Sequence, residues 1–152
     1  MTERSVTHAT FTIHRVYPAA PARVFAAFAS PEAKTQWFAG PREWARSAYE
    51  LDFRVGGREI SRVGPPGGTV HAYDARYLDI VPDQRIIFAY DMHLDALKIS
   101  VSLTTVEFRA EGAGTRLSFT EQGAFLDGYD NPRQREEGTN FLLDALGRTF
   151  VD

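Results

Sequence analysis

The residue types that most often carry chemistry in proteins are dispersed along this sequence. Cysteine is absent, which excludes disulfides, zinc–thiolate sites and thiol catalysis. The four histidines, His8, His14, His71 and His93, show no metal-binding spacing of the His-x-x-x-His kind. The sequence also contains no Gly-x-Ser-x-Gly turn and no phosphate-binding loop. We therefore expect no metal and no cofactor, and catalysis would need acid–base groups that the fold brings together.

Three residues with hydrogen-bonding side chains, His71, Tyr73 and Tyr90, lie on stretches that alternate like strands. His71 and Tyr73 share the parity of Tyr77, so these three are expected on one face of a strand. Tyrosine hydroxyls on the wall of an apolar cavity would orient a ligand. The alternative is a ladder of tyrosines on the outer, half-exposed face. We expect at least one of them to face inward.

Glu121 shares strand parity with Leu117 and Phe119, so it faces the core if they do. A carboxylate there would orient a polar group of a ligand or pair with Arg54 or Arg135. The alternative is a position past the edge of the core, in solvent. Because buried carboxylates are rarely unpaired, a structural ion pair or the solvent position is favoured over a role in orienting a ligand.

Aromatic side chains supply the remaining candidates for a pocket. Trp37, Phe38 and Trp44 cluster around a predicted helix and the loop after it, where they form either a pocket wall or ordinary core. The segment 125–129 precedes the last helix and is either a lid or a plain connector. We predict the following ligand-binding residues: Trp37, Phe38, Trp44, Phe53, His71, Tyr73, Tyr90, Glu121, Phe125, Gly138, Phe141, Leu142 and Ala145.

Strand-like alternation and helical spacing divide the chain into the elements that position these residues. Alternation predicts strands over 7–17, 49–55, 70–80, 85–92, 97–108 and 115–122. Gly56-Gly57 indicates a two-residue hairpin between 49–55 and a further strand. Short helices are predicted over 22–29 and over 30–38, the second with Ser30 as its cap and Pro31 in its first turn.

The apolar parity changes within the stretch 97–108. Ile99, Val101 and Leu103 share one phase, whereas Val106 and Phe108 share the other. A β-bulge at Thr104-Thr105 would account for the change and bend the sheet. The alternative is that one half of the strand buries its other face.

The last segment is predicted as a long helix. Asn131 is its cap and is followed by Pro132 in the first turn. An apolar stripe runs through Phe141, Leu142, Ala145, Leu146 and Phe150, and extends back to Gly138 and to Gln134 or Arg135. Gly138 either leaves room for a ligand or allows close helix packing. We predict an α+β fold in which a curved antiparallel sheet is wrapped around this helix, with a pocket between them.

Composition limits the classes of function. The chain has 152 residues, which fits one domain. Its net charge of -3 and the lack of a basic stripe argue against nucleic-acid binding. No signal peptide and no apolar run of about 20 residues is visible, so membrane insertion is not expected and a cytoplasmic location is the default.

Several short motifs, in this order and spacing, resemble a known family. On these motifs the chain resembles the SRPBCC superfamily, also called START-like or helix-grip proteins, and in particular the branch of the activator of Hsp90 ATPase in its C-terminal domain form. The motifs are Pro21-Ala22-Arg23-Val24-Phe25, Pro31-Glu32, Trp37-Phe38-Ala39-Gly40-Pro41, Phe53-Arg54-Val55-Gly56-Gly57, Tyr77-Leu78-Asp79-Ile80-Val81-Pro82, Gly114-Thr115-Arg116-Leu117 and Thr120-Glu121-Gln122-Gly123-Ala124-Phe125.

The resemblance implies a hydrophobic cavity between sheet and helix but no single activity. Members bind lipids, hormones or polyketides, and some cyclise or dehydrate polyketides. Many relatives carry a tryptophan after a glycine early in the C-terminal helix, where this chain has Gly138-Thr139-Asn140. We therefore expect a cavity of different shape here.

Three functions follow as hypotheses. The favoured one is a binding protein for a small apolar or aromatic molecule. The second is an enzyme similar to polyketide cyclases and aromatases, which would use acid–base groups of the cavity. The third is a chaperone-modulating interaction domain. Mixed charges at the outward positions Glu50, Asp52 and Arg54 are typical of a solvated face, and the sequence lacks the N-terminal domain of the eukaryotic co-chaperones. The resemblance also allows a homodimer.

Overall fold

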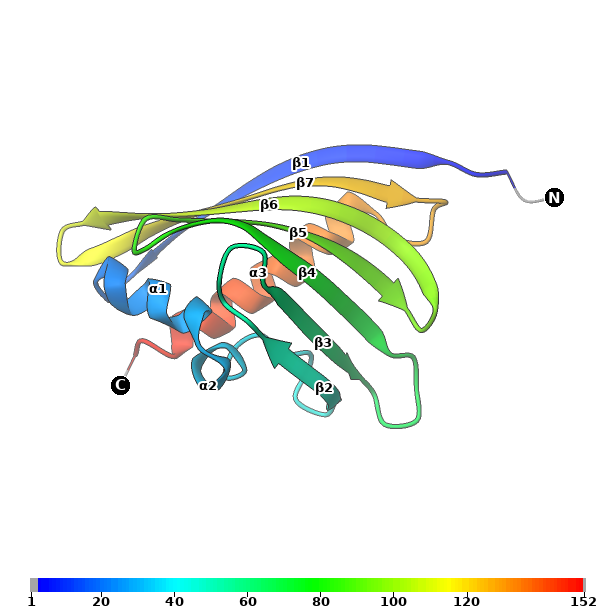
Figure 1. Ribbon diagram of the computed structural model, residues 1–152, viewed down its shortest axis with the longest axis horizontal. Helices are drawn as coiled ribbons and strands as arrows, with labels where there is room; N and C mark the ends of the chain where they lie inside the picture. Colours follow the sequence, from blue (N-terminus) through cyan, green and yellow to red (C-terminus); the bar gives the residue numbers. More distant parts are fainter. Residues whose placement is uncertain (1–2, 152) are drawn as a thin grey trace.

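The computed structural model describes residues 3–151, which form a seven-stranded antiparallel sheet and three helices (Figure 1). The strands are β1 (Val6–Tyr17), β2 (Ala45–Leu51), β3 (Arg58–Gly64), β4 (His71–Val81), β5 (Arg85–Leu94), β6 (Leu97–Glu111) and β7 (Gly114–Leu126), and the helices are α1 (Pro21–Ala29), α2 (Pro31–Lys34) and α3 (Pro132–Arg148). The spatial order is β1-β7-β6-β5-β4-β3-β2.

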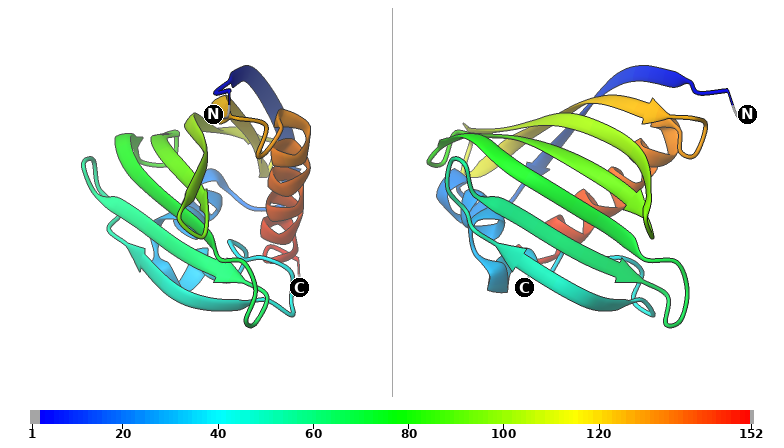
Figure 2. Two further views of the ribbon diagram at one scale, coloured as in Figure 1. Left: turned by 90° about the vertical axis from the view of Figure 1, so that its right-hand side faces the viewer. Right: turned by 45° about the vertical axis from the view of Figure 1, so that its right-hand side comes forward.

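The predicted α+β helix-grip architecture is confirmed. The sheet is curved, α3 crosses its concave side, and α1 and α2 lie together near one end (Figure 2). The core contains fully buried side chains of the sheet, such as Ile86, Val106 and Leu117, and of α3, Leu143 and Leu146. This arrangement lets one helix and the inner face of the sheet bury each other's apolar side chains.

The bulge predicted at Thr104-Thr105 is wrong. Thr104 pairs with Phe88 and with Glu121, and the register of β6 runs unbroken through Thr105. The irregularity lies earlier, where Ile99 is the extra residue between the pairs Met92–Ser100 and His93–Lys98.

The inner face of β6 beyond this bulge is polar in its first half. Ser100, Ser102 and Thr104 are buried, whereas Val101 and Leu103 point outward and are exposed. The apolar phase therefore changes although the strand keeps the same face inward.

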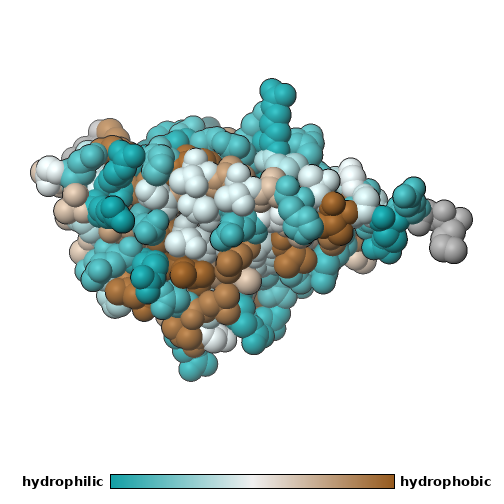
Figure 3. All heavy atoms as spheres, turned by 90° about the horizontal axis from the view of Figure 1, so that it is seen from above, coloured by the Kyte–Doolittle hydropathy of each residue, from teal (hydrophilic) through white to brown (hydrophobic). Residues whose placement is uncertain are grey.

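Figure 3 shows hydrophobic side chains gathered in patches among polar ones on the surface seen from above.

The two-residue hairpin predicted at Gly56-Gly57 is also wrong. β2 ends at Leu51 and β3 begins at Arg58, so the connection spans 52–57. It runs along β4, because Gly56 N–H donates to the Tyr77 carbonyl at 2.8 Å and Tyr77 N–H donates to the Gly57 carbonyl at 3.0 Å. A Cβ atom at Gly57 would lie 2.0 Å from the Asp52 carbonyl oxygen, so this close approach requires glycine.

The helix boundaries agree with the prediction except at the end of α2. Ser30 caps α2, because its Oγ accepts from Ala33 N–H at 3.2 Å. Asn131 caps α3, because its Oδ1 accepts from Gln134 N–H at 2.9 Å. α2 ends at Lys34 instead of Phe38, and the chain continues as turns.

The buried face of α3 differs from the predicted stripe. Leu146 and Phe150 are buried, Leu142 and Ala145 are half-buried, and Phe141 is 48% exposed. The side chains that the stripe left out, Thr139 and Leu143, are buried instead. The contact face is therefore rotated by about one residue, because Arg135 rather than Gln134 is turned toward the sheet. None of the helices within residues 3–151 combines the length and the hydropathy that a membrane crossing requires.

Candidate ligand-binding cavity

A cavity of about 540 Å³ lies between the concave face of the sheet and the first half of α3. Side chains from β3 to β7, from α1 and α2, and from the chain after α2 complete its walls. Its mouth is marked by the exposed lining residues, which are Tyr129, Gln134, Gly138 and Phe141. Small-molecule sites in proteins typically measure about 300–1,000 Å³. The cavity is thus large enough for a small organic molecule.

Most of the predicted ligand-binding residues line this cavity. They are Trp37, Phe38, Trp44, His71, Tyr73, Tyr90, Glu121, Gly138, Phe141 and Leu142. Phe53, in the 52–57 connection, packs instead on Phe25, with ring centroids 5.7 Å apart. Phe125 is buried under the guanidinium of Arg135, 5.3 Å from its ring centroid, and Ala145 lies farther along α3. Whether the lining residues bind a ligand stays a prediction.

Aromatic rings form much of the cavity wall. Tyr73 lies between Phe38 and Tyr90, with ring centroids 4.9 and 4.8 Å away. Trp44 and His71 stack at 4.6 Å. Rings in contact at these distances make offset and edge-to-face pairs that fix one another's orientation. Two of the predicted tyrosines therefore face inward, as expected.

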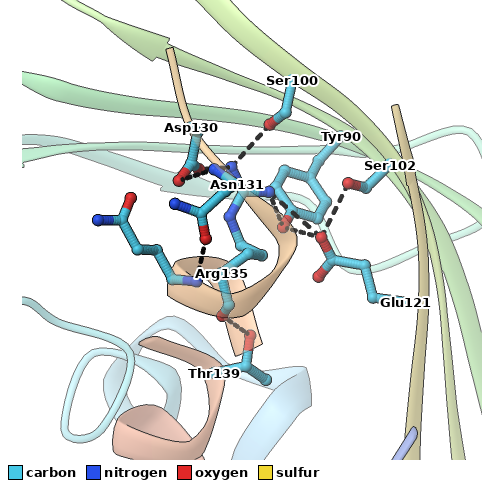
Figure 4. A network of polar contacts seen from close by, with 9 residues as sticks. Tyr90, Ser100, Ser102, Glu121, Asp130, Asn131, Arg135 and Thr139 are labelled. Atoms are coloured by element: carbon cyan, nitrogen blue, oxygen red, sulfur yellow. Dashed lines mark hydrogen bonds and ion pairs between the residues drawn. The ribbon is translucent and has the colours of Figure 1, made fainter. Parts of the chain in front are cut away.

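Glu121 ends a polar network on one wall of the cavity and is only 1% exposed (Figure 4). Its Oε2 atom accepts from Tyr90 OH and from Ser102 Oγ, both at 2.8 Å. Burial raises the pKa of Tyr90, and the nearby Glu121 carboxylate adds to this rise while Arg135 opposes it. Tyr90 is therefore a protonated donor at neutral pH.

Arg135 pairs with Glu121, and its hydrogen bonds connect the first turn of α3 to the sheet. Its Nη1 donates to Tyr90 OH at 2.8 Å and to Glu121 Oε2 at 3.2 Å. Its Nη2 donates to Ser100 Oγ at 2.7 Å and to Asp130 Oδ2 at 2.8 Å. Arg135 is thus the partner of Glu121, as one of the two proposed alternatives. The other proposed partner, Arg54, is exposed and pairs with Asp52. A planar guanidinium suits such a set of contacts better than an ammonium.

A second buried ion pair joins α2 to β3. Lys34 Nζ donates to Glu59 Oε1 at 2.9 Å, and both side chains are almost fully buried. Glu59 also accepts from Tyr49 OH at 2.6 Å and from Tyr77 OH at 3.0 Å. The Lys34 ammonium lies 4.6 Å from the ring centroid of Phe38, within cation–π range, and the residue lines the cavity.

Sequence reasoning missed Lys34 and Glu59. Lysine and glutamate are the residues most often placed on the surface, so neither suggested a buried site. A signal existed in β3, where Glu59 and Ser61 share one parity and Ile60 shares the other with Arg62. Both faces of that strand carry a charge, so the pattern does not say which charge is buried. Among residues 3–151, no group of three or more potential metal ligands gathers anywhere.

A family model for activator of Hsp90 ATPase homolog 1-like proteins matches residues 18–150. The chain belongs to this family. The match spans α1 to α3 and therefore includes the elements that build the cavity. This confirms the resemblance drawn from the sequence motifs.

Solved structures similar to this member of the activator of Hsp90 ATPase homolog 1-like family come from several bacteria. An uncharacterized protein from Rhizobium leguminosarum is 53% identical, with 96% of each chain covered and a TM-score of 0.91. A protein from Rhizobium loti is 50% identical over 95% of this chain and 98% of that one, with a TM-score of 0.88. An activator-like protein from Aeromonas hydrophila, 20% identical over 92% and 90% of the chains with a TM-score of 0.70, shares the fold. Comparison with curated proteins gives no match.

Three polar atoms of this family member are left free at the cavity. Within residues 3–151, Glu121 Oε1, Tyr73 OH and Ser61 Oγ make no hydrogen bond. All three residues are buried and line the cavity. Burial raises the pKa of the Tyr73 hydroxyl well above its usual range, so this group is protonated. These three atoms are therefore available for hydrogen bonds with a molecule in the cavity.

We expect Gly138→Ala to raise the free energy of unfolding by about 1 kcal/mol. Glycine lowers the stability of a helix interior by about that amount relative to alanine. A Cβ atom at Gly138 would meet nothing within 4 Å, so the gain comes without a clash. The measurement is urea unfolding followed by circular dichroism. Gly147→Ala in the same helix is the matched control, because its Cβ would lie 3.1 Å from Tyr17 and should gain less. A loss of stability in Gly138→Ala would contradict this expectation.

The imidazole of His71 is expected to titrate below pH 6.5 in the folded protein. Burial lowers its pKa, while Asp95 and Asp130 oppose this effect. Because the unfolded chain keeps a histidine pKa of about 6.5, it binds the proton more tightly than the folded chain. The stability contributed by neutral His71 is therefore present above pH 6.5 and is lost as the pH falls below it. An NMR titration of the His71 ring protons checks this, and a midpoint at or above 6.5 would contradict it. His71→Gln should lack this part of the pH dependence.

Proposed function

We propose that this protein binds a small, largely apolar or aromatic molecule in the cavity between the sheet and α3. The observation that supports this most is an aromatic-walled cavity of about 540 Å³ that carries a few polar groups, among them Glu121 and Tyr73. Apolar walls with a small number of placed polar groups are typical of small-molecule sites. Membership of the activator of Hsp90 ATPase homolog 1-like family is compatible with a fold of the ligand-binding type.

Binding is favoured over acid–base catalysis because the buried charged side chains at the cavity are engaged in ion pairs. Glu121 is paired with Arg135, and Lys34 is paired with Glu59. Burial raises the pKa values of Tyr73 and Tyr90 away from neutrality. An efficient general acid or base has a pKa near the working pH. The cyclase-like alternative would need a group with such a pKa, and neither tyrosine offers one. It would therefore have to act through His71, which lines the cavity and whose pKa burial lowers from 6.5.

The finer expectations about surroundings are proposals as well. We propose a cytoplasmic location, with which the absence of cysteine is compatible. A homodimer and a chaperone partner stay predictions from the family resemblance.

The experiment is a thermal-shift screen of apolar and aromatic compounds on the wild-type protein. A ligand at about 100 times its Kd stabilises the folded state by about 2.7 kcal/mol. For a chain of this size that corresponds to a rise in Tm of roughly 5–10 °C. Silence across the whole library would count against the proposed function.

Leu142 provides a matched pair of variants that locates the binding. It projects from α3 into the cavity and is half-buried. Leu142→Trp should fill part of the cavity and weaken every ligand found in the screen. Leu142→Met conserves volume and should leave binding within a few-fold of wild type. Equal affinities in both variants would place the ligand elsewhere on the molecule.

A further inference from the structure

Resting on the proposed function, we propose that the polar end of the ligand is an uncharged hydrogen-bond donor, such as a phenolic hydroxyl, which donates to Glu121 Oε1. A ligand whose polar end is a carboxylate is excluded. The cavity would thus select phenols and other flat molecules with a neutral donor, and would reject fatty acids and aromatic acids of the same size.

The first support is the uneven use of the two Glu121 oxygens. Oε2 accepts from Tyr90, Ser102 and Arg135, at 2.8, 2.8 and 3.2 Å. Oε1 accepts from no group within residues 3–151, and Figure 4 shows it pointing away from the network. The residue is 1% exposed and lines the cavity. A carboxylate oxygen in such surroundings takes a donor, and a hydrogen bond to it is charge-assisted.

The second support is the charge at this end of the cavity. Glu121 and Asp130 carry two negative charges, and Arg135 carries one positive charge that both carboxylates share. Both terminal nitrogens of Arg135 already donate to the protein. A ligand carboxylate placed here would add a third negative charge in a poorly solvated site, which is strongly unfavourable.

The third support is that Lys34, the other cationic side chain at the cavity, is also held in an ion pair. Lys34 donates to Glu59 at 2.9 Å, and its ammonium faces the rings of Phe38 and Trp37 at 4.6 and 5.5 Å. Among the described residues, the lysine and arginine that line the cavity are therefore both paired. A carboxylate ligand finds no unpaired lysine or arginine there.

The fourth support is Tyr73, whose hydroxyl has no partner within residues 3–151 although the residue is buried. Its ring centroid lies 4.8 Å from that of Tyr90, which donates to Glu121. A ligand hydroxyl that donates to Glu121 Oε1 has lone pairs left, and the Tyr73 hydroxyl is a protonated donor on the same wall. An aromatic ring attached to that hydroxyl would lie among the rings of the cavity wall.

The test compares three probes of matched shape by isothermal titration calorimetry at neutral pH. The probes are 4-phenylphenol, biphenyl and biphenyl-4-carboxylate. We expect 4-phenylphenol to bind about tenfold or more tightly than biphenyl, since a net hydrogen bond to a charged group contributes about 1.5–3 kcal/mol. Biphenyl-4-carboxylate should bind more weakly than biphenyl.

The possible outcomes separate this inference from the proposed function. If biphenyl binds and the phenol is no tighter, or if the carboxylate is the tightest, the inference is overturned while binding in the cavity stands. If none of the three probes binds, the inference is overturned, and the thermal-shift screen of the whole library decides on the proposed function.

Glu121→Gln tests the role of the carboxylate itself. The glutamine carbonyl can still accept from Tyr90, Ser102 and Arg135, while its amide group presents a donor where Oε1 was. The ratio of phenol to biphenyl affinities should fall, and biphenyl-4-carboxylate should gain affinity. Both affinities of this ratio are measured on the same variant. A smaller folded fraction would lower both by the same factor and would leave the ratio unchanged. Unchanged ratios in Glu121→Gln would overturn the assignment, and the wild-type comparison stands alone if the variant fails to fold.

Discussion

Lys34→Met is expected to lower the free energy of unfolding by about 3–5 kcal/mol. Removing one partner of a buried ion pair has this effect because the remaining charge is left in the interior without compensation. Here that charge is Glu59, whose side chain is 0% exposed. Within residues 3–151 it would keep the hydroxyls of Tyr49 and Tyr77 as donors. For a chain of this size the Tm should fall by roughly 6–20 °C. Urea unfolding of both proteins measures the difference directly.

Arg85→Met is the matched control for this prediction. Arg85 pairs with Asp79 at 2.6 Å, but the two side chains are 47% and 38% exposed. Exposed ion pairs contribute about 0–1 kcal/mol, so this variant should stay within 1 kcal/mol of wild type. The double variant Lys34→Met/Glu59→Met, which removes both charges, should regain part of the loss. If Lys34→Met costs no more than Arg85→Met, the buried pair does not stabilise the fold as described.

Arg135→Leu is the second change expected to have a large effect. It removes the guanidinium that bonds to Glu121, Ser100, Asp130 and Tyr90. The carboxylate of Glu121, a residue that is 1% exposed, then lacks its cation. We expect a loss of about 3–5 kcal/mol in the free energy of unfolding. Because Arg135 joins the start of α3 to three strands, amide hydrogen exchange should rise most in the first turns of α3.

Two variants control this second prediction. Arg133 lies two residues earlier on the same helix and forms an ion pair with Glu137, in which the two side chains are 90% and 65% exposed. Arg133→Leu removes this exposed pair. It should change stability by less than 1 kcal/mol. Arg135→Lys keeps the charge but cannot form the forked set of contacts, so its stability should be intermediate. Equal losses in Arg133→Leu and Arg135→Leu would contradict the role given to the Glu121 network.

The fold was predictable because local patterns and global architecture agree over most of the chain. Alternation located β1 and β4 to β7 within a few residues, and the caps Ser30 and Asn131 located two helix starts. These signals are local, and tertiary contacts rarely override them when they are strong.

Predictions that depended on side-chain direction were less secure. The Gly56-Gly57 pair looks like a tight hairpin, but hydrogen bonds to Tyr77, on the following strand β4, hold a longer connection. The apolar stripe of α3 was predicted about one residue away from its buried face, because Phe141 is 48% exposed whereas Thr139 and Leu143 are buried. Of the two residues expected at the start of the stripe, Arg135 pairs with Glu121.

The polar part of the cavity shows the same contrast. Glu121, Tyr73 and Tyr90 follow from parity on strongly alternating strands. Lys34 and Glu59 were missed because burial of these two types depends on each finding the other, 25 positions apart in the sequence. The inward position of Ser100 and Ser102 was not predicted, because the bulge at Ile99 sets which face of β6 they occupy.

The most direct test of ligand binding in the cavity is an isotope-filtered NOE experiment on labelled protein with bound 4-phenylphenol. We expect contacts from the ring protons of the probe to the methyl groups of Leu142 and Met92, which line the cavity. Val101 and Leu103 lie exposed on the opposite face of the sheet and should show none. Contacts confined to Val101 and Leu103, with none to Leu142 or Met92, would contradict a ligand held between the sheet and α3.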